Sequence, residues 1–529
     1  MPILLPGETY PDISQNLFLA LEKVAAQYPE KTAITSDDVP YKYKDIIELV
    51  ERLMTSLRID YGIRKGDVVL LYENANIEFV IITFAILGLG GIVCPLNTKL
   101  TLAEINRYIE TVHNKLFIIQ DSLVQKLVVK SDSEIAFPFI TDIKVLNEIL
   151  ADGNIIATVP RFSFYQEKID PNDGCFLLFT SGTSNKPKIV QLSHRNVLHA
   201  AESYRRAYKL TEHDSSIISV PIFYVTGLIG LLTTFLLIGG SLHLFQRFDA
   251  QQTLSCVSKN QLTFLHISPT VLTKLLDQEK NYQQLPSLRI IACGSSYLPN
   301  GTVYKFKGWL SSCSLQPVFG MTETSSPALI MPIDVLTNNK LGSVGLPIAG
   351  LEVKIVDVNG TLVSQPTQEG NLYIRGTNVI NSYYLSENSN DFFDGGWLNT
   401  GDIAYVDDQG FYYICGRAKD LIIRGGENIL PSEIEDIISE LNWVKECSVF
   451  GVTDQFYGEI VHAAIVMKEG FDLVGTVDNC IHDYLSTRLA SYKIPTAIMI
   501  LCDLPRSGSG KVSKMKLRHL VERGINYES

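Results

Sequence analysis

Short apolar runs alternate along this chain with longer segments whose apolar residues repeat at helical spacing. Residues 43–57 have the helical spacing, and the apolar runs lie at residues 68–71, 92–94, 116–119, 217–220 and 288–291. A strand buried on both faces reads as an unbroken apolar run, so the alternation predicts doubly wound α/β layers. From about residue 342 strands alternate with turns instead, at residues 351–355, 371–374 and 410–414, which predicts a β-rich subdomain.

The length of the chain calls for more than one hydrophobic core. At roughly 100–200 residues per domain, 529 residues predict about three cores. After Gly416 the pattern becomes that of a compact α/β segment. A helix is expected to begin there at Pro431, because proline followed by acidic residues suits a first helical turn.

The charge balance and the cysteine spacing exclude several classes of protein. The 57 acidic and 45 basic residues give a net charge of -12, without runs of like charge, so a nucleic-acid-binding protein is disfavoured. The nine cysteines are widely spaced and form no CxxC pair, and the nine histidines include no HExxH. Neither a zinc ribbon nor a disulfide scaffold fits, and a reducing, cytoplasmic compartment is expected.

Two apolar stretches have the length of membrane spans. Residues 79–97 and 215–246 are both long enough, but glycines and prolines divide each of them into shorter pieces. We therefore expect buried helices and strands of an α/β core and no transmembrane segment, while peripheral membrane contact stays open. Residues 1–10 have neither the basic nor the apolar region of a secretory signal.

Residues 177–188 form the segment with the clearest chemistry. An apolar strand leads into a loop rich in hydroxyl groups and glycine that ends in two lysines, before a helix near residues 193–196. Backbone amides, hydroxyl donors and cations together suit a polyphosphate. The loop lacks the GxxxxGK[ST] pattern of P-loop nucleotidases, and taken alone such a loop is more often simply solvated.

Six further motifs follow in order, at residues 316–324 (QPVFGMTET), 342–347 (GSVGLP), 396–403 (GWLNTGDI), 416–420 (GRAKD), 425–429 (GGENI) and 504–511 (LPRSGSGK). With residues 177–188, they resemble the adenylate-forming enzymes, the superfamily of acyl-CoA synthetases, adenylation domains and luciferases. The resemblance covers essentially the whole chain. It implies two doubly wound α/β subdomains and a β-rich subdomain within a large N-terminal domain, residues 1–418, and a small mobile α+β C-terminal domain, residues 419–529.

The resemblance also implies ATP, Mg²⁺ and coenzyme A as the small molecules that the enzyme uses. An acid and ATP would give acyl-AMP and pyrophosphate, and after domain rotation the CoA thiol would attack to give acyl-CoA and AMP. By position, the nucleotide-binding residues are Thr180, Ser181, Gly182, Thr183, Lys188, Phe319, Gly320, Thr322, Asp402 and Arg417.

Each of these roles suits the chemistry of the side chain that would perform it. Asp402 has two oxygens for the two ribose hydroxyls, and the guanidinium of Arg417 is a planar fork of donors. Glu323 would help to hold Mg²⁺, which keeps water and takes few protein ligands. Lys511 would bridge the acid and the α phosphate during adenylation, and with Glu323 and Thr180 it forms the expected catalytic set.

Residues near the domain boundary and around the acyl group are assigned in the same way. Lys419 matches the hinge, and Gly425 and Gly426 match the wall of the pantetheine tunnel. The acyl pocket is expected to be formed by Tyr224, Gly294, Ser295, Ser296 and Met321, together with Gly320, Ser325 and Ser326. None of these residues is cationic, so a second carboxylate would lack a partner and a monocarboxylic acid is expected.

Asn185 and Ile189 stand where the family usually has glycine. A β-branched residue does not tolerate positive φ, so Ile189 is expected to stiffen the phosphate-binding turn. Two alternatives therefore stay open beside the acyl-CoA synthetase: a stand-alone adenylation enzyme that loads a carrier protein, and a non-catalytic nucleotide-binding relative.

Overall fold

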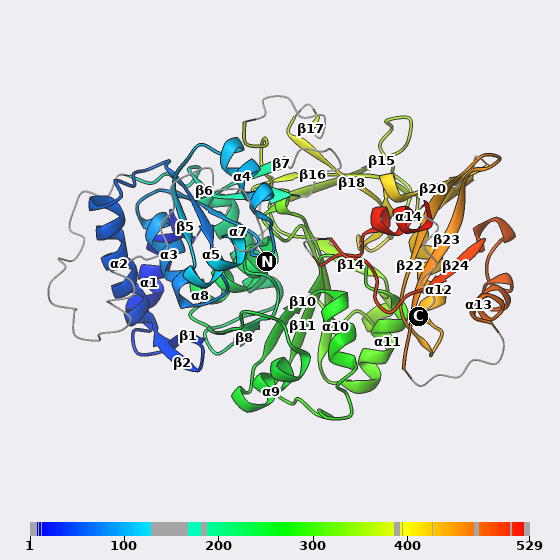
Figure 1. Cartoon of the computed structure of the whole chain (residues 1–529), viewed down its shortest axis with the longest axis horizontal. Coiled ribbons are helices and arrows are strands. Elements are labelled where there is room, and N and C mark those ends of the chain that lie inside the picture. Colours follow the sequence, from blue (N-terminus) through cyan, green and yellow to red (C-terminus); the bar gives the residue numbers. More distant parts are fainter. Residues whose placement is uncertain are drawn as a thin grey trace.

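The structure of the chain is a computed structural model (Figure 1). It describes residues 8, 10–11, 13–128, 168–180, 188–385, 392–393, 395–425, 427–469, 476–507 and 510–522. In Figure 1 the first half of the chain, in blue to green, fills one side, and the orange C-terminal strands lie at the opposite end, with the red helix α14 above α11.

The first sheet is five-stranded, in the order β5-β3-β4-β6-β7. Its strands are β3 (Val68–Tyr72), β4 (Ile92–Pro95), β5 (Asn114–Ile119), β6 (Gly174–Thr180) and β7 (Lys188–Ser193), with α3 (Ile77–Gly88), α4 (Leu102–Thr111) and α5 (Asp121–Val128) among the connections. All pairs are parallel except β6 with β7. The parallel strands end at one edge, where Thr180 lies.

A second sheet has the order β2-β1-β9-β8. It contains β1 (Thr32–Ser36), β2 (Val39–Lys42), β8 (Ser215–Ile218) and β9 (Ser241–Leu244), and its helical neighbours in the sequence are α1 (Leu17–Gln27), α2 (Tyr43–Ile59), α7 (His194–Ala207), a π-helix η2 (Thr226–Thr233) and α8 (Thr234–Leu237). A π-helix of this length is rare and is frequently found at a functional site.

The third sheet has ten strands, in the order β10-β11-β12-β13-β14-β19-β18-β16-β15, with β17 beside β18. The strands are β10 (Phe264–Ile267), β11 (Ile290–Gly294), β12 (Ser314–Phe319), β13 (Leu329–Ile330), β14 (Ser343–Pro347), β15 (Leu351–Val356), β16 (Gly370–Gly376), β17 (Phe392–Phe393), β18 (Trp397–Val406) and β19 (Tyr412–Arg417). Its helices are α9 (Ala250–Asn260), α10 (Pro269–Leu276) and α11 (Asn300–Trp309), with the 3-10 turns η3 (Thr322–Thr324) and η4 (Thr337–Asn339). The β-rich strands therefore extend an α/β sheet rather than forming a sheet of their own.

The last part of the chain builds a separate sheet, β21-β20-β23-β22 with β24 beside β23. After the 3-10 turn η5 (Ala418–Asp420) come β20 (Ile422–Arg424), β21 (Glu427–Ile429), α12 (Pro431–Ser439), β22 (Val444–Asp454), β23 (Gly458–Met467), α13 (Val477–Ser486), η6 (Ser491–Lys493), β24 (Ala497–Ile500) and α14 (Lys514–Glu522). Helix α12 begins with Pro431 in its first turn, as predicted.

Hydrophobic packing follows this division of the chain. Among the described residues, three clusters of buried apolar side chains lie wholly before residue 405, and two lie wholly after residue 421. No cluster of buried side chains among the described residues joins the two parts.

Both span-like stretches fold as buried elements of the α/β core. The first becomes α3 and β4, and the second becomes β8, η2, α8 and β9. None of the helices in the described part of the chain is both long and apolar enough to cross a bilayer. The predicted strands agree closely with the structure, except that β8 ends at Ile218, β11 begins only at Ile290 and β19 begins only at Tyr412.

Candidate active site

Asp402, in the middle of β18, forms an ion pair with Arg417, the last residue of β19. The two residues are register partners, and Nε of Arg417 lies 2.9 Å from Oδ1 of Asp402. The other carboxylate oxygen, Oδ2, is buried and has no hydrogen-bond partner among the described residues. Burial raises the pKa of Asp402, and the positive charge of Arg417 opposes that rise. A buried acceptor without a partner fits a ribose hydroxyl, which is the role that the sequence predicts.

Glu323 lies in η3 with its carboxylate buried. The hydroxyl of Tyr383 donates to Oε1 of Glu323 over 2.8 Å, and the ammonium of Lys188 lies 4.9 Å from the centre of the Tyr383 ring. Burial raises the pKa of Glu323, while Arg417 and Lys188 pull it down. The carboxylate is thus held in a place where a further cation would favour its charged form.

The residues around Glu323 fit a magnesium ion that is bound mainly by substrate. In the part of the chain that the structure describes, no group of three or more His, Cys, Asp or Glu side chains could hold a metal by itself. Mg²⁺ commonly takes one or two carboxylates and completes its shell with phosphate oxygens and water. Glu323 can therefore serve as the single protein ligand, and bound Mg²⁺ would neutralise phosphate charge.

Lys511 follows a tight turn in the C-terminal domain. The amide of Ser507 donates to the carbonyl of Lys511 over 2.8 Å, and Gly510 has a φ of 83°. Arg506 ties this turn to the large domain, because its guanidinium donates to Oγ1 of Thr270 in α10 over 2.8 Å. The sequence-predicted catalytic lysine is thus carried by a segment that already contacts the large domain.

Charged residues of the predicted nucleotide site act on the pKa of Lys511. The side chain keeps an exposed surface, yet enough protein surrounds it that burial lowers its pKa, and Arg417 lowers it further. Asp402 and Glu323 act in the opposite direction. Lys511 therefore lies in the electrostatic reach of Arg417, Asp402 and Glu323, and the structure brings these four predicted residues together.

Thr180 and Lys188 flank the predicted phosphate-binding loop. They are register partners on β6 and β7, and the Thr180 hydroxyl donates to the Lys188 carbonyl over 3.4 Å. Ser181, Gly182, Thr183 and Asn185 lie outside the described residues. Ile189 is buried in β7 opposite Phe179 and is not among the residues with positive φ. The expectation that Ile189 stiffens the turn is therefore wrong, since the residue belongs to the strand.

A short turn at Gly320 and Met321 connects β12 to η3. Phe319 ends the strand, Gly320 and Met321 make the turn, and Thr322 begins η3. A Cβ atom on Gly320 would lie 1.5 Å from the carbonyl oxygen of Ser326, so only glycine fits this close approach. The turn therefore fixes the backbone that carries both Met321 and Glu323.

Tyr224 stands at the entry to the π-helix. Nδ2 of Asn97, just beyond the carboxyl end of β4, donates to the Tyr224 hydroxyl over 3.1 Å, and burial raises the pKa of Tyr224 to about 12. Two residues later, Oγ1 of Thr226 lies 3.2 Å from Oγ of Ser295. Hydrogen bonds thus link the predicted acyl residue Tyr224 to the first sheet, and η2 to Ser295.

Three serines near the predicted acyl pocket have positive φ. The values are 74° for Ser295, 55° for Ser325 and 95° for Ser326. Ser325 donates to the carbonyl of Asn378 over 2.9 Å, and Ser326 shares a 2.8 Å hydrogen bond with the hydroxyl of Tyr204. Non-glycine residues in this region are strained, and such strain concentrates at functional sites.

Gly294, Ser296 and Met321, three further residues of the predicted acyl pocket, differ in their surroundings. A Cβ on Gly294 would lie 2.5 Å from the carbonyl oxygen of Val318, so the side of Gly294 that lacks a side chain packs against backbone. The side chain of Ser296 is exposed. Met321 is partly buried against the main hydrophobic cluster.

The predicted hinge and tunnel residues lie on the C-terminal side of β19. Lys419 is exposed in the three-residue turn η5. Gly425 has a φ of 60°, and its amide donates to the carbonyl of Tyr457 over 2.7 Å. Gly426 lies outside the described residues.

Sequence reasoning missed Tyr383, Asn97 and the anchoring role of Arg506. Tyr383 is 60 residues from Glu323, and Asn97 is 127 residues from Tyr224. No local pattern marks such pairs. Arg506 did lie in a recognised motif, where its guanidinium could have suggested a contact across the domain boundary.

Comparison with known proteins identifies the family. The AMP-binding enzyme family matches residues 21–384, and the C-terminal domain of AMP-binding enzymes matches residues 433–511. The chain belongs to the AMP-binding enzymes. The recognition made from the seven motifs is thereby confirmed, as is the fold class.

The relatives of this AMP-binding enzyme span nearly its whole length. It is 31% identical to the 2-succinylbenzoate–CoA ligase of Bacillus pumilus, over 93% of this chain and 95% of the relative. It is 30% identical to the oxalate–CoA ligase of Arabidopsis thaliana, over 96% and 99%. An anthranilate CoA ligase bound to anthranoyl-AMP superposes with a TM-score of 0.85 at 25% identity, covering 97% of this chain and 99% of that one.

A second solved structure adds the nucleotide and the metal. The o-succinylbenzoate CoA synthetase of Bacillus subtilis, in complex with ATP and a magnesium ion, matches with a TM-score of 0.80 and 28% identity, over 96% of this chain and 99% of that one. The prediction of an AMP-forming acid–thiol ligase that uses ATP, Mg²⁺ and CoA is confirmed.

Proposed function

We propose that this AMP-binding enzyme activates a monocarboxylic acid with an apolar body and transfers the acyl group to CoA. The single observation that carries the proposal is the convergence of Lys511, Asp402, Arg417 and Glu323, because it joins the mobile lysine to the nucleotide residues. Such a cation stabilises negative charge as the acid joins the α phosphate.

Each residue has one task in this proposal. Asp402 binds ribose through its unpartnered oxygen, and Arg417 orients that carboxylate and donates toward the phosphates. Thr180, Lys188 and the intervening residues hold the β and γ phosphates. Lys511 contacts the acid and the α phosphate together, which places the two reactants in an orientation for attack.

The acid is proposed to lack a second charge. Tyr224 is neutral at physiological pH, and burial raises its pKa further, to about 12. The other predicted pocket residues, Gly294, Ser295, Ser296 and Met321, carry no charge. A second carboxylate among these groups would be buried without a cation, which costs several kcal/mol. Two of the relatives are named for oxalate and for 2-succinylbenzoate, so dicarboxylic acids are the informative comparison.

A division at residues 418 and 419, a hinge at Lys419 and a cytoplasmic location belong to the same proposal. The separate hydrophobic clusters before residue 405 and after residue 421 support the division. The exposed turn η5 supports the hinge, since its φ and ψ can change without disturbing a core. The wide spacing of the cysteines supports a reducing compartment.

A pyrophosphate-release screen tests the proposal. Monocarboxylic acids of increasing length, aryl acids and matched dicarboxylic acids would be compared with ATP, with and without CoA. We expect release with at least one monocarboxylic acid, and thioester formation with free CoA. Pyrophosphate release with dicarboxylic acids and with no monocarboxylic acid would contradict the proposal that the acyl pocket is uncharged. Transfer only to a carrier protein would favour the stand-alone adenylation enzyme, and silence despite ATP binding would favour a non-catalytic relative.

A further inference from the structure

The loop of residues 295–299, between β11 and α11, connects the predicted acyl pocket with the C-terminal domain. At one end, Ser295 lies 3.2 Å from the hydroxyl of Thr226 at the start of the π-helix. Toward the other end, the hydroxyl of Tyr297 faces Asp436 of α12 and, as a donor, lowers the pKa of that carboxyl. One short segment therefore contacts both the site of the acid and the domain that carries Lys511.

Asp436 also completes the first turn of α11. The backbone amide of Asn300 donates to Oδ1 of Asp436 over 3.1 Å. The residue before the helix is Pro299, whose side chain makes no capping hydrogen bond. An unsatisfied amide at a helix start favours a carboxylate, and here the carboxylate comes from the other domain.

Helices α11 and α12 pack closely around this contact. A Cβ on Gly301 would lie 2.4 Å from the carbonyl oxygen of Ser439, so the two backbones are nearly in contact. Helix α12 is in turn fixed to its own domain through Glu435, which accepts from the amide of Val449 over 2.8 Å and pairs with Lys514 at 2.9 Å. A movement of α12 therefore moves the domain that contains Lys511.

The Asp436 contact is of a kind that can open in each catalytic cycle. Burial raises the pKa of Asp436, the charges of Glu435 and Glu440 raise it further, and the donors on Tyr297 and Asn300 lower it. The carboxylate therefore accepts from the neutral Asn300 amide, and the other donor that faces it, the Tyr297 hydroxyl, is also neutral. Such contacts contribute only modestly to the free energy of domain association, and they require one relative orientation of the two groups. Both properties suit a latch that opens and closes reversibly.

We infer that Asp436 is a positioning residue that latches the C-terminal domain with Lys511 at the active site, and that residues 295–299 couple this latch to occupancy of the acyl pocket. The coupling rests on the proposed function, because that proposal assigns Ser295 to the pocket. The latch itself rests only on the contacts of Tyr297, Asn300 and Asp436.

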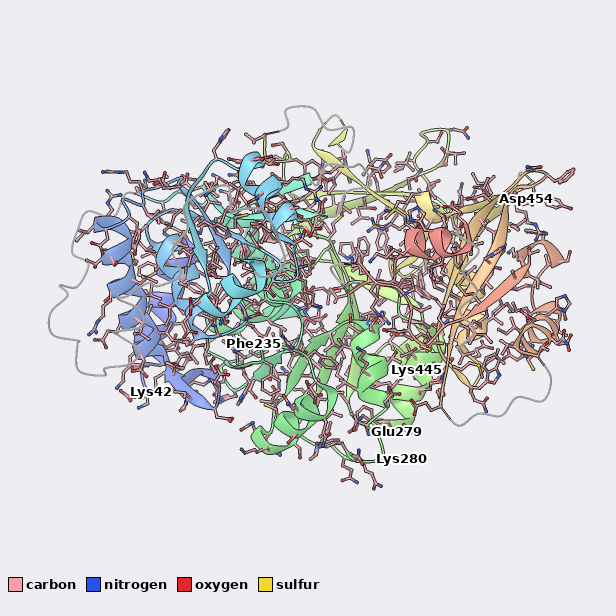
Figure 2. All side chains as sticks on the ribbon, in the orientation of Figure 1. Lys42, Phe235, Glu279, Lys280, Lys445 and Asp454 are labelled. Carbon is pink, nitrogen blue, oxygen red and sulfur yellow. The ribbon has the colours of Figure 1, made fainter. Side chains whose placement is uncertain are left out.

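Cross-linking measures the latch without any turnover. Asp277 and Lys445 form an ion pair of 2.7 Å across the two domains, and both side chains are partly exposed; Figure 2 labels Lys445 where α11 meets the C-terminal strands. With Asp277→Cys and Lys445→Cys, a short bismaleimide would bridge the domains only in this orientation, and mass spectrometry would identify the linked peptides.

Tyr297→Phe and Asp436→Ala are each expected to slow cross-linking of the ligand-free protein about tenfold, which corresponds to the loss of one hydrogen bond. An unchanged rate in both variants would overturn the latch. Because no substrate is present, this outcome is independent of whether the proposed acid chemistry is correct.

The coupling is tested with an acid that the screen identifies. Saturating acid is expected to speed cross-linking in the parent protein. Thr226→Val should keep the ligand-free rate and lose most of the response to acid, since it removes the hydroxyl that Ser295 contacts. A full response in Thr226→Val, or no response in the parent, would overturn the coupling.

Separate half-reactions distinguish positioning from a general loss of stability. In proteins with the native Asp277 and Lys445, Tyr297→Phe should lower acid-dependent pyrophosphate exchange about tenfold and leave thioester formation from supplied acyl-AMP unchanged. Lys445→Ala is the matched control, because exposed ion pairs contribute little, and it should change neither step. Equal losses of both steps in Tyr297→Phe would contradict the latch.

Discussion

Oδ1 of Asp402 is held by Arg417 at 2.9 Å, while Oδ2 of the same buried carboxylate has no partner among the described residues. One half of the side chain is thus oriented by protein and the other half is left for a ligand. Burial raises the pKa of this carboxyl, and carboxyl groups with a pKa perturbed in this way are common at functional sites.

Asp402→Asn should weaken ATP binding without unfolding the protein. Asparagine keeps the shape but offers one acceptor oxygen instead of two, so the KM for ATP in pyrophosphate exchange should rise about tenfold or more. Because the native pKa of Asp402 is raised, its charged form costs folding free energy at neutral pH, and the neutral variant should unfold at no lower a temperature. Glu352→Gln, at the partly exposed ion pair with Arg375, is the control and should leave the KM for ATP unchanged.

Lys511→Ala should separate the two half-reactions. Loss of a cation placed on a developing charge typically lowers a rate by about 10²–10³-fold, so pyrophosphate exchange should fall by that amount. Thioester formation from supplied acyl-AMP should continue, since that step follows rotation of the lysine away from the site. An equal loss of both steps would contradict the assignment.

The pH dependence of adenylation should show the lowered pKa of Lys511. The ammonium form is the active one, and its pKa lies below the ordinary value of 10.5, so pyrophosphate exchange should decline with rising pH before 10.5 is reached. Lys511→Arg keeps its charge in this range, so whatever exchange it retains should not decline there. If the variant and the parent declined together, another group would control the profile.

Gly320→Ala should damage the fold as well as the site. The added Cβ would meet the Ser326 carbonyl at 1.5 Å, and overpacking of this kind costs about 1–3 kcal/mol or more. Gly308→Ala is the matched control: Gly308 lies within α11 with nothing within 4 Å of the added atom, so alanine should stabilise the protein by about 0.5–1 kcal/mol. Urea unfolding of both variants measures the difference, and a stable Gly320→Ala would contradict the close approach.

The fold class could be predicted from the sequence because the patterns that indicate strands and helices are local. The apolar runs that correspond to β3, β4 and β5 are buried strands, and a helix does begin at Pro431, as predicted. The continuity of β14 and β19 with the α/β strands could not be read in advance, since strand pairing over 60 residues leaves no periodic pattern.

The candidate site was predicted where a motif carries the chemistry and missed where distant contacts do. Lys511, Asp402 and Arg417 each lie in a motif, and they converge. Tyr383 has no motif, although its hydroxyl holds Glu323. Ile189 was misjudged because the boundary between loop and strand decides whether positive φ is needed, and that boundary follows from pairing with Phe179.

The hydrogen-bonded ladder from β12 through β19 runs without a break from the turn that holds Glu323 to Arg417, one residue before η5. A continuous sheet of this kind resists bending, so with the hinge that we propose at Lys419, rotation of the small domain would be concentrated in residues 418–420. The small domain should accordingly rotate as one rigid unit. The backbone dihedral angles of only a few residues would then set the direction of that rotation.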